Sequence, residues 1–137
     1  RLSNLYGSGM SKKNVMSDIL MQIPGNGIVK VRDSRPVRDF LYIDDLLAAF
    51  SLMVTKSYNG IFNVGSGDPI SIFKLAEIIL TVANQGDRTI ISTQPGVSDS
   101  INTLDISKTS KVLGWCPSGT LKQHLSKLVL SGVSSNG

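Results

Sequence analysis

The segment from Val37 to Phe50 places the strongest constraint on the fold, because it predicts a strand that leads directly into a helix. Its apolar residues first alternate, so that Phe40 and Tyr42 lie on one face of a strand and Leu41 on the other. Apolar residues then recur at helical spacing, which predicts a helix over 45–55 with one face on a core. Strand and helix together form a unit that would hold nearby side chains in fixed places.

The charged residues of this unit have structural and functional interpretations. Asp44 stands at the N-cap position of the helix, and the carboxylate of Asp45 complements the positive end of the helix dipole. Arg38 lies at the start of the anchored strand, where a cation can be held in place. A simpler interpretation pairs Arg38 with Asp39 on the surface, in an ion pair that contributes little to stability.

Composition argues against several classes of protein. The chain has 137 residues, of which 41% are hydrophobic and 18% charged, as in one globular domain. No apolar run approaches the roughly 20 residues that cross a membrane, so we expect no membrane contact. The net charge of +4 is mild and unclustered, which disfavours nucleic acid as a partner. Cys116 is the only cysteine, so no internal disulfide can form, which fits a cytoplasmic protein.

The rest of the chain alternates strand and helix patterns, which indicates an α/β fold. Strands are expected at 2–6, 28–31, 61–64 and 89–93, and helices at 12–23, 72–82, after Asp105 and after Thr120. Helix ends are signalled by Ser71 as an N-cap, by Gly114 as a C-terminal glycine, and by Thr120 with Gln123 as a capping box. We expect residues 1–130 to form one unit and residues 131–137 to be a frayed tail.

Three further features are given structural interpretations. His124 lies off the apolar stripe of the last helix, so we expect a solvated side chain. Cys116 is expected to be structural. The Gly65-Ser66-Gly67 loop could approach a phosphate, but it lacks the last glycine of a dinucleotide fingerprint, which favours a turn beneath a pocket.

Several motifs occur in an order that resembles the NAD-dependent epimerase/dehydratases, the extended short-chain dehydrogenase/reductases that act on nucleotide sugars. They are RLSNLYG at residue 1, RDFLYIDDL at 38, FNVGSG at 62, and DISK at 105 followed by LGWCP at 113. The resemblance covers the chain from Arg1 to about Pro117. It implies the C-terminal, substrate-binding portion of such an enzyme, a partial doubly wound sheet with helices. We expect the chain to start partway through a larger protein, with the N-terminal dinucleotide-binding half absent.

The resemblance also implies roles for individual residues. Arg38 would bind the diphosphate of a nucleotide-diphosphate sugar, with Asn4 in the same region, and Ser3 would lie beside the nicotinamide of NAD. Asn14, Val15 and Val31 would form walls of the nucleotide pocket. Members of the family often carry an aromatic residue where Val31 stands and a glycine where Arg32 stands. Gln94 replaces the family's second diphosphate arginine, and the acid that follows is either displaced to Asp99 or lost, so the diphosphate clamp is half built.

Catalysis in the family uses a Tyr-x-x-x-Lys pair, which this chain lacks. Four residues after Tyr6, Tyr42 and Tyr58 stand Met10, Leu46 and Phe62. We therefore assign no catalytic residue, and we expect NAD to serve the complete enzyme and not to bind this chain alone. Bare strand edges predict self-association, or a dimer in the complete enzyme. The alternatives are a stand-alone sugar-nucleotide-binding or regulatory module and an RNA-binding relative of the superfamily.

Overall fold

The computed structural model describes residues 1–55, 58–96 and 100–134, with side chains to residue 130. The strands are β1 (Asn4–Tyr6), β2 (Val29–Val31), β3 (Val37–Arg38), β4 (Phe40–Tyr42), β5 (Ile70–Ser71), β6 (Ile90–Ser92) and β7 (Ile101–Asn102). The helices are α1 (Val15–Leu20), α2 (Ile43–Thr55), α3 (Ile72–Val82), α4 (Ser107–Leu113) and α5 (Leu121–Ser134). Within these residues, none of the helices has the length and apolar character that a membrane span requires.

The strands form three small sheets, in which parallel pairing dominates. β1 pairs in parallel with β4, and on the other side of β1 Leu2 forms a parallel bridge with Val64. β2 pairs in parallel with β6. β3 lies between β5, which is antiparallel to it, and β7, which is parallel. This confirms the predicted α/β class and the parallel, partial sheet.

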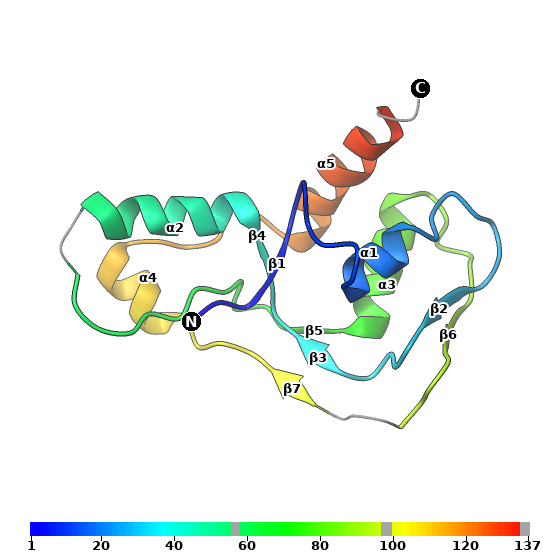
Figure 1. Ribbon diagram of the computed structural model, residues 1–137, viewed down its shortest axis with the longest axis horizontal. Coiled ribbons are helices and arrows are strands. Elements are labelled where there is room, and N and C mark those ends of the chain that lie inside the picture. The colour runs from blue at the N-terminus through cyan, green and yellow to red at the C-terminus, as the bar shows by residue number, and fades with distance from the viewer. Residues whose placement is uncertain (56–57, 97–99, 135–137) are drawn as a thin grey trace.

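Two hydrophobic clusters lie on opposite faces of β4, and the alternation in the sequence assigns each side chain to its cluster. Phe40 is buried in the larger cluster with residues of α1 and α3, whereas Leu41 is buried in the smaller one with residues of α2. Figure 1 shows the same division, with α2 and α4 on one side of β1 and β4 and with α1 and α3 on the other. The prediction of opposite faces for Phe40 and Leu41 is confirmed.

The helix end signals at Ser71, Gly114 and Thr120 are also confirmed. The Ser71 hydroxyl accepts a hydrogen bond from the Lys74 amide at the start of α3. Gly114 ends α4 with a φ of 65°, a conformation in which a side chain would be strained. The Thr120 and Gln123 side chains each accept a hydrogen bond from the other's backbone amide, as a capping box does.

Several expected boundaries differ from the structure. α2 begins at Ile43, so Asp44 lies in its first turn and is not the N-cap. The helix expected at 12–23 covers only Val15–Leu20: Asn14 caps its start, and Met21 is its C-cap. The strand expected at 61–64 is reduced to the bridge at Val64, and Ile61 is exposed.

At the other end, the last helix is longer than expected. α5 runs to Ser134, into the segment where a frayed tail was expected to begin, and residues 135–137 lie outside the described part. Asp105 accepts hydrogen bonds from the amide and hydroxyl of Ser107, which lower the pKa of its carboxyl group. Asp105 therefore supports the start of α4 from one residue before the N-cap, which is Ile106.

Candidate functional site

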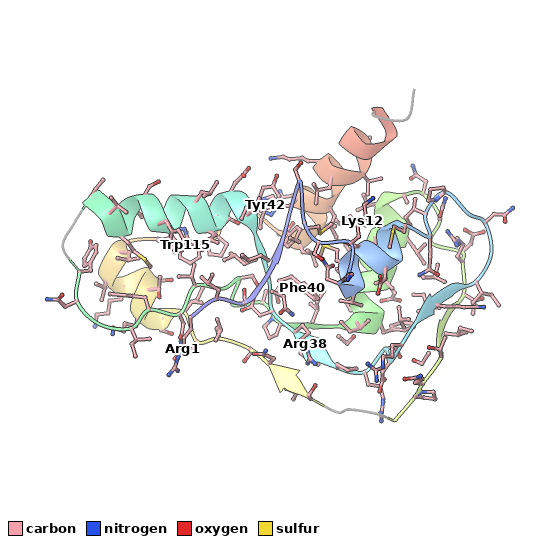
Figure 2. The ribbon with its side chains drawn as sticks, in the orientation of Figure 1. Arg1, Lys12, Arg38, Phe40, Tyr42 and Trp115 are labelled. Carbon is pink, nitrogen blue, oxygen red and sulfur yellow. The ribbon has the colours of Figure 1, made fainter. Side chains whose placement is uncertain are left out.

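Arg38 is fixed at the edge where β3 meets β7 (Figure 2). Its Nη1 donates to the backbone oxygens of Val37 and Ser100, each at 2.8 Å, and its Nη2 donates to the Ser100 hydroxyl at 2.7 Å. A guanidinium has five N–H donors, so Nε–H and one Nη2–H remain without a partner among the described residues. These two donors lie on one edge of the planar group, the arrangement that grips two oxygens at once.

Asp39 does not pair with Arg38, which overturns the simpler interpretation of this charged pair. Its side chain is buried, and Oδ1 accepts from the amide of Ser66 at 2.7 Å and from its hydroxyl at 2.6 Å. Oδ2 accepts from the Gly67 amide at 3.3 Å. A side chain on Gly65 would place its Cβ 2.5 Å from Oδ2, which explains the glycine. The Gly-Ser-Gly loop is thus bound by an internal carboxylate, as a structural turn would be.

Gln94 has a partner that the sequence did not indicate. Its Oε1 accepts a hydrogen bond of 3.0 Å from Nε of Arg32, and its backbone amide donates to the Arg32 carbonyl at 2.8 Å. The residue that replaces the family's second arginine therefore holds a different arginine. Asp99 lies outside the described residues.

The other residues that the resemblance singled out are spread over the molecule. Asn4 is exposed on β1, where its amide donates to the carbonyl of Asp39, next to Arg38. Val31 is buried in the larger cluster, and Val15 packs against the same cluster. Asn14 caps α1: its Oδ1 accepts from the Ser17 amide and its Nδ2 donates to the Ser11 carbonyl. The side chain of Asn14 is therefore already engaged in structure, although it also lines a hollow of about 300 Å³ beside the 7–11 loop.

A group of three aromatic rings, of which Tyr6 and His124 are buried and Tyr42 is half-buried, was missed by the sequence reasoning. His124 is 4% exposed, so the expectation of a solvated side chain is wrong. Its ring stacks on Tyr42 with centroids 4.2 Å apart, and its Nδ1 lies 3.1 Å from the Tyr6 hydroxyl. A usable signal was present, because residue 124 is three positions after Leu121 and four before Leu128, which places it beside the apolar stripe.

The three rings line a cavity of about 210 Å³, to which Asp45, Ser66 and Lys122 also contribute. Burial raises the pKa of Tyr6 far above its usual range, and the carboxylate of Asp45 adds to this effect. The pKa of Tyr42 is raised as well, by desolvation and then by the charge and hydrogen bond of Asp44. Both hydroxyls therefore stay protonated at neutral pH and can donate hydrogen bonds.

The raised pKa of Tyr6 predicts a loss of stability in alkali. Above pH ~10 the unfolded chain releases the Tyr6 proton while the folded chain keeps it, so the free energy of unfolding should fall by up to ~1.4 kcal/mol per pH unit. Below that pH this residue should contribute no slope. Urea unfolding between pH 8 and 11 measures the slope, and Tyr6→Phe should reduce it. An equal slope in the variant would show that Tyr6 is not its source.

Comparison with known proteins identifies the family. The model of the NAD dependent epimerase/dehydratase family matches residues 1–65. The chain is also 34% identical, over 96% of its length, to dTDP-4-dehydro-6-deoxyglucose reductase of Escherichia coli, of which it covers 43%. The chain belongs to the NAD-dependent epimerase/dehydratase family. The resemblance stated from the motifs is thereby confirmed.

Solved structures of the epimerase/dehydratase family share this fold. UDP-glucose 4-epimerase of Thermotoga maritima, solved with UDP-glucose, superimposes with a TM-score of 0.87 at 24% identity, over 100% of this chain and 46% of that one. RMD of Pseudomonas aeruginosa, solved with NADPH, has a TM-score of 0.84 at 26% identity, over 100% of this chain and 47% of that one. The chain thus spans less than half the length of each of these relatives.

The described residues offer little that fits the NAD expected of an epimerase/dehydratase. The Ser3 hydroxyl, at the position that the motif places beside the nicotinamide, is a buried polar atom with no hydrogen-bond partner among them. The amides of Ser66 and Gly67, which could have met a phosphate, are taken by Asp39. One unpaired hydroxyl does not make a dinucleotide site. The same part of the chain contains no group of His, Cys, Asp and Glu that could hold a metal ion.

Proposed function

We propose that this chain supplies the nucleotide-sugar-binding portion of an NAD-dependent sugar epimerase, dehydratase or reductase. The observation that carries the proposal is the state of Arg38. Three of its donors are tied to Val37 and Ser100, and one edge of its guanidinium has no partner in the described part of the chain. Guanidinium binds phosphate oxygens through two parallel hydrogen bonds, so a diphosphate fits this edge.

Asn4 supports the same assignment. It is exposed on β1, and it is the register partner of Phe40, two residues beyond Arg38. Its side chain makes no hydrogen bond to the described residues, so its amide can contribute a donor near the same diphosphate. The N-terminal end of α1, at Asn14 and Val15, is proposed to contact the nucleotide without a hydrogen bond from the Asn14 side chain. That side chain is already engaged, because its Oδ1 caps the helix.

Hydride transfer is proposed to depend on groups other than those of this chain. The tyrosine and lysine pair that the family uses is absent, and the loop that could cradle a phosphate is held by Asp39. We therefore propose that the chain binds the sugar nucleotide and that NAD acts in the complete enzyme. Self-association stays a prediction, and Leu47, Phe50 and Val54 expose an apolar face of α2 that could take part.

The variant Arg38→Ala tests the proposal. Loss of a charge-assisted hydrogen bond costs roughly 1.5–3 kcal/mol, so the dissociation constant for UDP-glucose or dTDP-glucose should rise roughly tenfold to a hundredfold. Arg38→Lys should recover only part of the affinity, because an ammonium group cannot grip two oxygens in one plane. Isothermal titration calorimetry measures each constant, and circular dichroism checks that the variants are folded. If folded Arg38→Ala binds as tightly as the parent chain, Arg38 does not bind the diphosphate.

A further inference from the structure

A cavity of about 210 Å³ lies at the base of α5, where this helix meets the ends of β1 and β4 (Figure 1). Its inner wall is formed by the group of three aromatic rings and by Asp45. Its rim includes the exposed residues Asp68 and Lys122, so the cavity is open to solvent. An apolar cavity of roughly 150 Å³ can take up benzene, so this one has room for a ring that carries a polar group.

The carboxylate of Asp45 brings a buried charge to this wall. Asp45 is 3% exposed, and its Oδ1 accepts a hydrogen bond of 2.9 Å from the amide of Ser118. Its Oδ2 has no hydrogen-bond partner among the described residues, and no Lys or Arg of that part of the chain is paired with it. Burial, and after it the charge of Asp45, raises the pKa of Tyr6, so the charge acts inside the cavity. A buried carboxylate is costly unless a cation and hydrogen bonds compensate it.

His124 brings a second unpaired atom close to Asp45. Its Nδ1 lies 3.1 Å from the Tyr6 hydroxyl, and its Nε2 has no partner in the described part of the chain. The loop at 118–119 joins the two groups, because Ser118 donates to Asp45 and a Cβ on the next residue, Gly119, would lie 3.1 Å from Nε2. The free carboxylate oxygen and the free ring nitrogen therefore border the same small space.

That space is the cavity. Within the described residues, the Ser3 hydroxyl is the only fully enclosed polar side-chain atom that lacks a partner, so Oδ2 of Asp45 and Nε2 of His124 have open space beside them. Both residues line the cavity. A metal ion does not fit there, because the same part of the chain holds no group of three or more His, Cys, Asp or Glu that could bind one. An organic group with hydrogen-bond donors and a positive charge fits both atoms.

We propose that this cavity binds a small organic cation, a primary ammonium group on an apolar body, and that Asp45 and His124 are its acceptors. An ammonium group has three N–H donors and no acceptor. Nε2 of His124 accepts when Nδ1 carries the ring proton and donates it to the Tyr6 hydroxyl. The aromatic wall contacts the apolar body and favours a nearby cation. Arg38 does not line this cavity, so the inference does not depend on the proposed function.

Calorimetry at neutral pH with two probes of the same shape tests the site. Benzylammonium carries the charge, and benzyl alcohol is its neutral analogue. The parent chain should bind benzylammonium at least about tenfold more tightly, because only the cation compensates the carboxylate. Asp45→Asn keeps an oxygen for the Ser118 amide and removes the charge, so it should raise the dissociation constant for benzylammonium about tenfold. Asp87→Asn removes an equal charge at an exposed position outside the cavity and should change nothing.

Gly119→Ala is a second variant, which fills the site and leaves its polar groups in place. The added Cβ would lie 3.1 Å from Nε2 of His124, so the folded variant should also lose about tenfold in affinity. Circular dichroism checks that each variant is folded. A parent chain that binds both probes equally or binds neither, or a folded Asp45→Asn that binds like Asp87→Asn, would overturn the inference. Binding that emerges only in Lys122→Gln would also overturn it, because the chain's own ammonium group would then be the occupant.

Discussion

Replacing Asp39 by alanine is expected to lower the free energy of unfolding by about 3–5 kcal/mol. The carboxylate is 1% exposed and accepts three hydrogen bonds from Ser66 and Gly67. Without it, the part-buried amide and hydroxyl donors of Ser66 and the amide of Gly67 lose their acceptor, and a donor left without a partner costs about 1–3 kcal/mol where water cannot replace that partner. The backbone of residue 39 also connects the sheets, since its amide donates to Asn102 and its carbonyl accepts from Asn4, and alanine can keep both of these bonds.

Asp39→Asn is the control for this experiment. It keeps an oxygen that can accept from Ser66, but it loses the charge and turns an amide group toward Gly67, so about half of the loss is expected. Urea unfolding followed by circular dichroism gives both values. A cost below about 1 kcal/mol for Asp39→Ala would mean that the 65–67 loop does not depend on this carboxylate, and the loop would then be available to a phosphate after all.

The parts of the fold that sequence reasoning predicted are those decided by neighbouring residues. The Ser71 cap, the left-handed Gly114 and the Thr120 capping box each depend on contacts within four positions along the chain. The alternation of Phe40 and Leu41 likewise placed each residue in its cluster, because a strand fixes the direction of successive side chains. The class of the fold follows from these local patterns.

The parts that were missed depend on contacts between distant segments. β3, β5 and β7 are two residues long each, too short for any pattern, and they exist because segments far apart in sequence meet. His124 is buried because Tyr6, 118 residues away, lies opposite it. The pair of Arg32 and Gln94 follows from the register of β2 with β6, which no local pattern determines. Sequence reasoning therefore missed the contact between Arg32 and Gln94, and the role of Arg38 stays a prediction.

Trp115 is the side chain whose removal should cost most in the smaller cluster. It is 4% exposed, packs with Leu41, and donates from its indole Nε1 to the backbone oxygen of Asp45 at 3.1 Å. Figure 2 places it between α2 and α4, the two helices that this cluster joins. Trp115→Ala should lower the free energy of unfolding by about 3–5 kcal/mol, the usual cost of deleting a buried tryptophan.

The motif around Trp115 is interpreted as a packing element. Substitutions of Trp115 should therefore lower the free energy of unfolding and leave the affinity for the ligand nearly unchanged. Trp115→Phe keeps one buried aromatic ring but loses the rest of the indole and its hydrogen bond to Asp45, so it should cost about 1–2 kcal/mol, less than Trp115→Ala. At temperatures where the variants are folded, both should bind UDP-glucose within about threefold of the parent chain, because Arg38, the proposed diphosphate-binding residue, lies outside the cluster that contains Trp115. Stability is measured by circular dichroism, since the chain has only one tryptophan and its fluorescence is lost in both variants. A folded Trp115→Phe with tenfold weaker binding would assign the tryptophan to the ligand site and would contradict the packing interpretation.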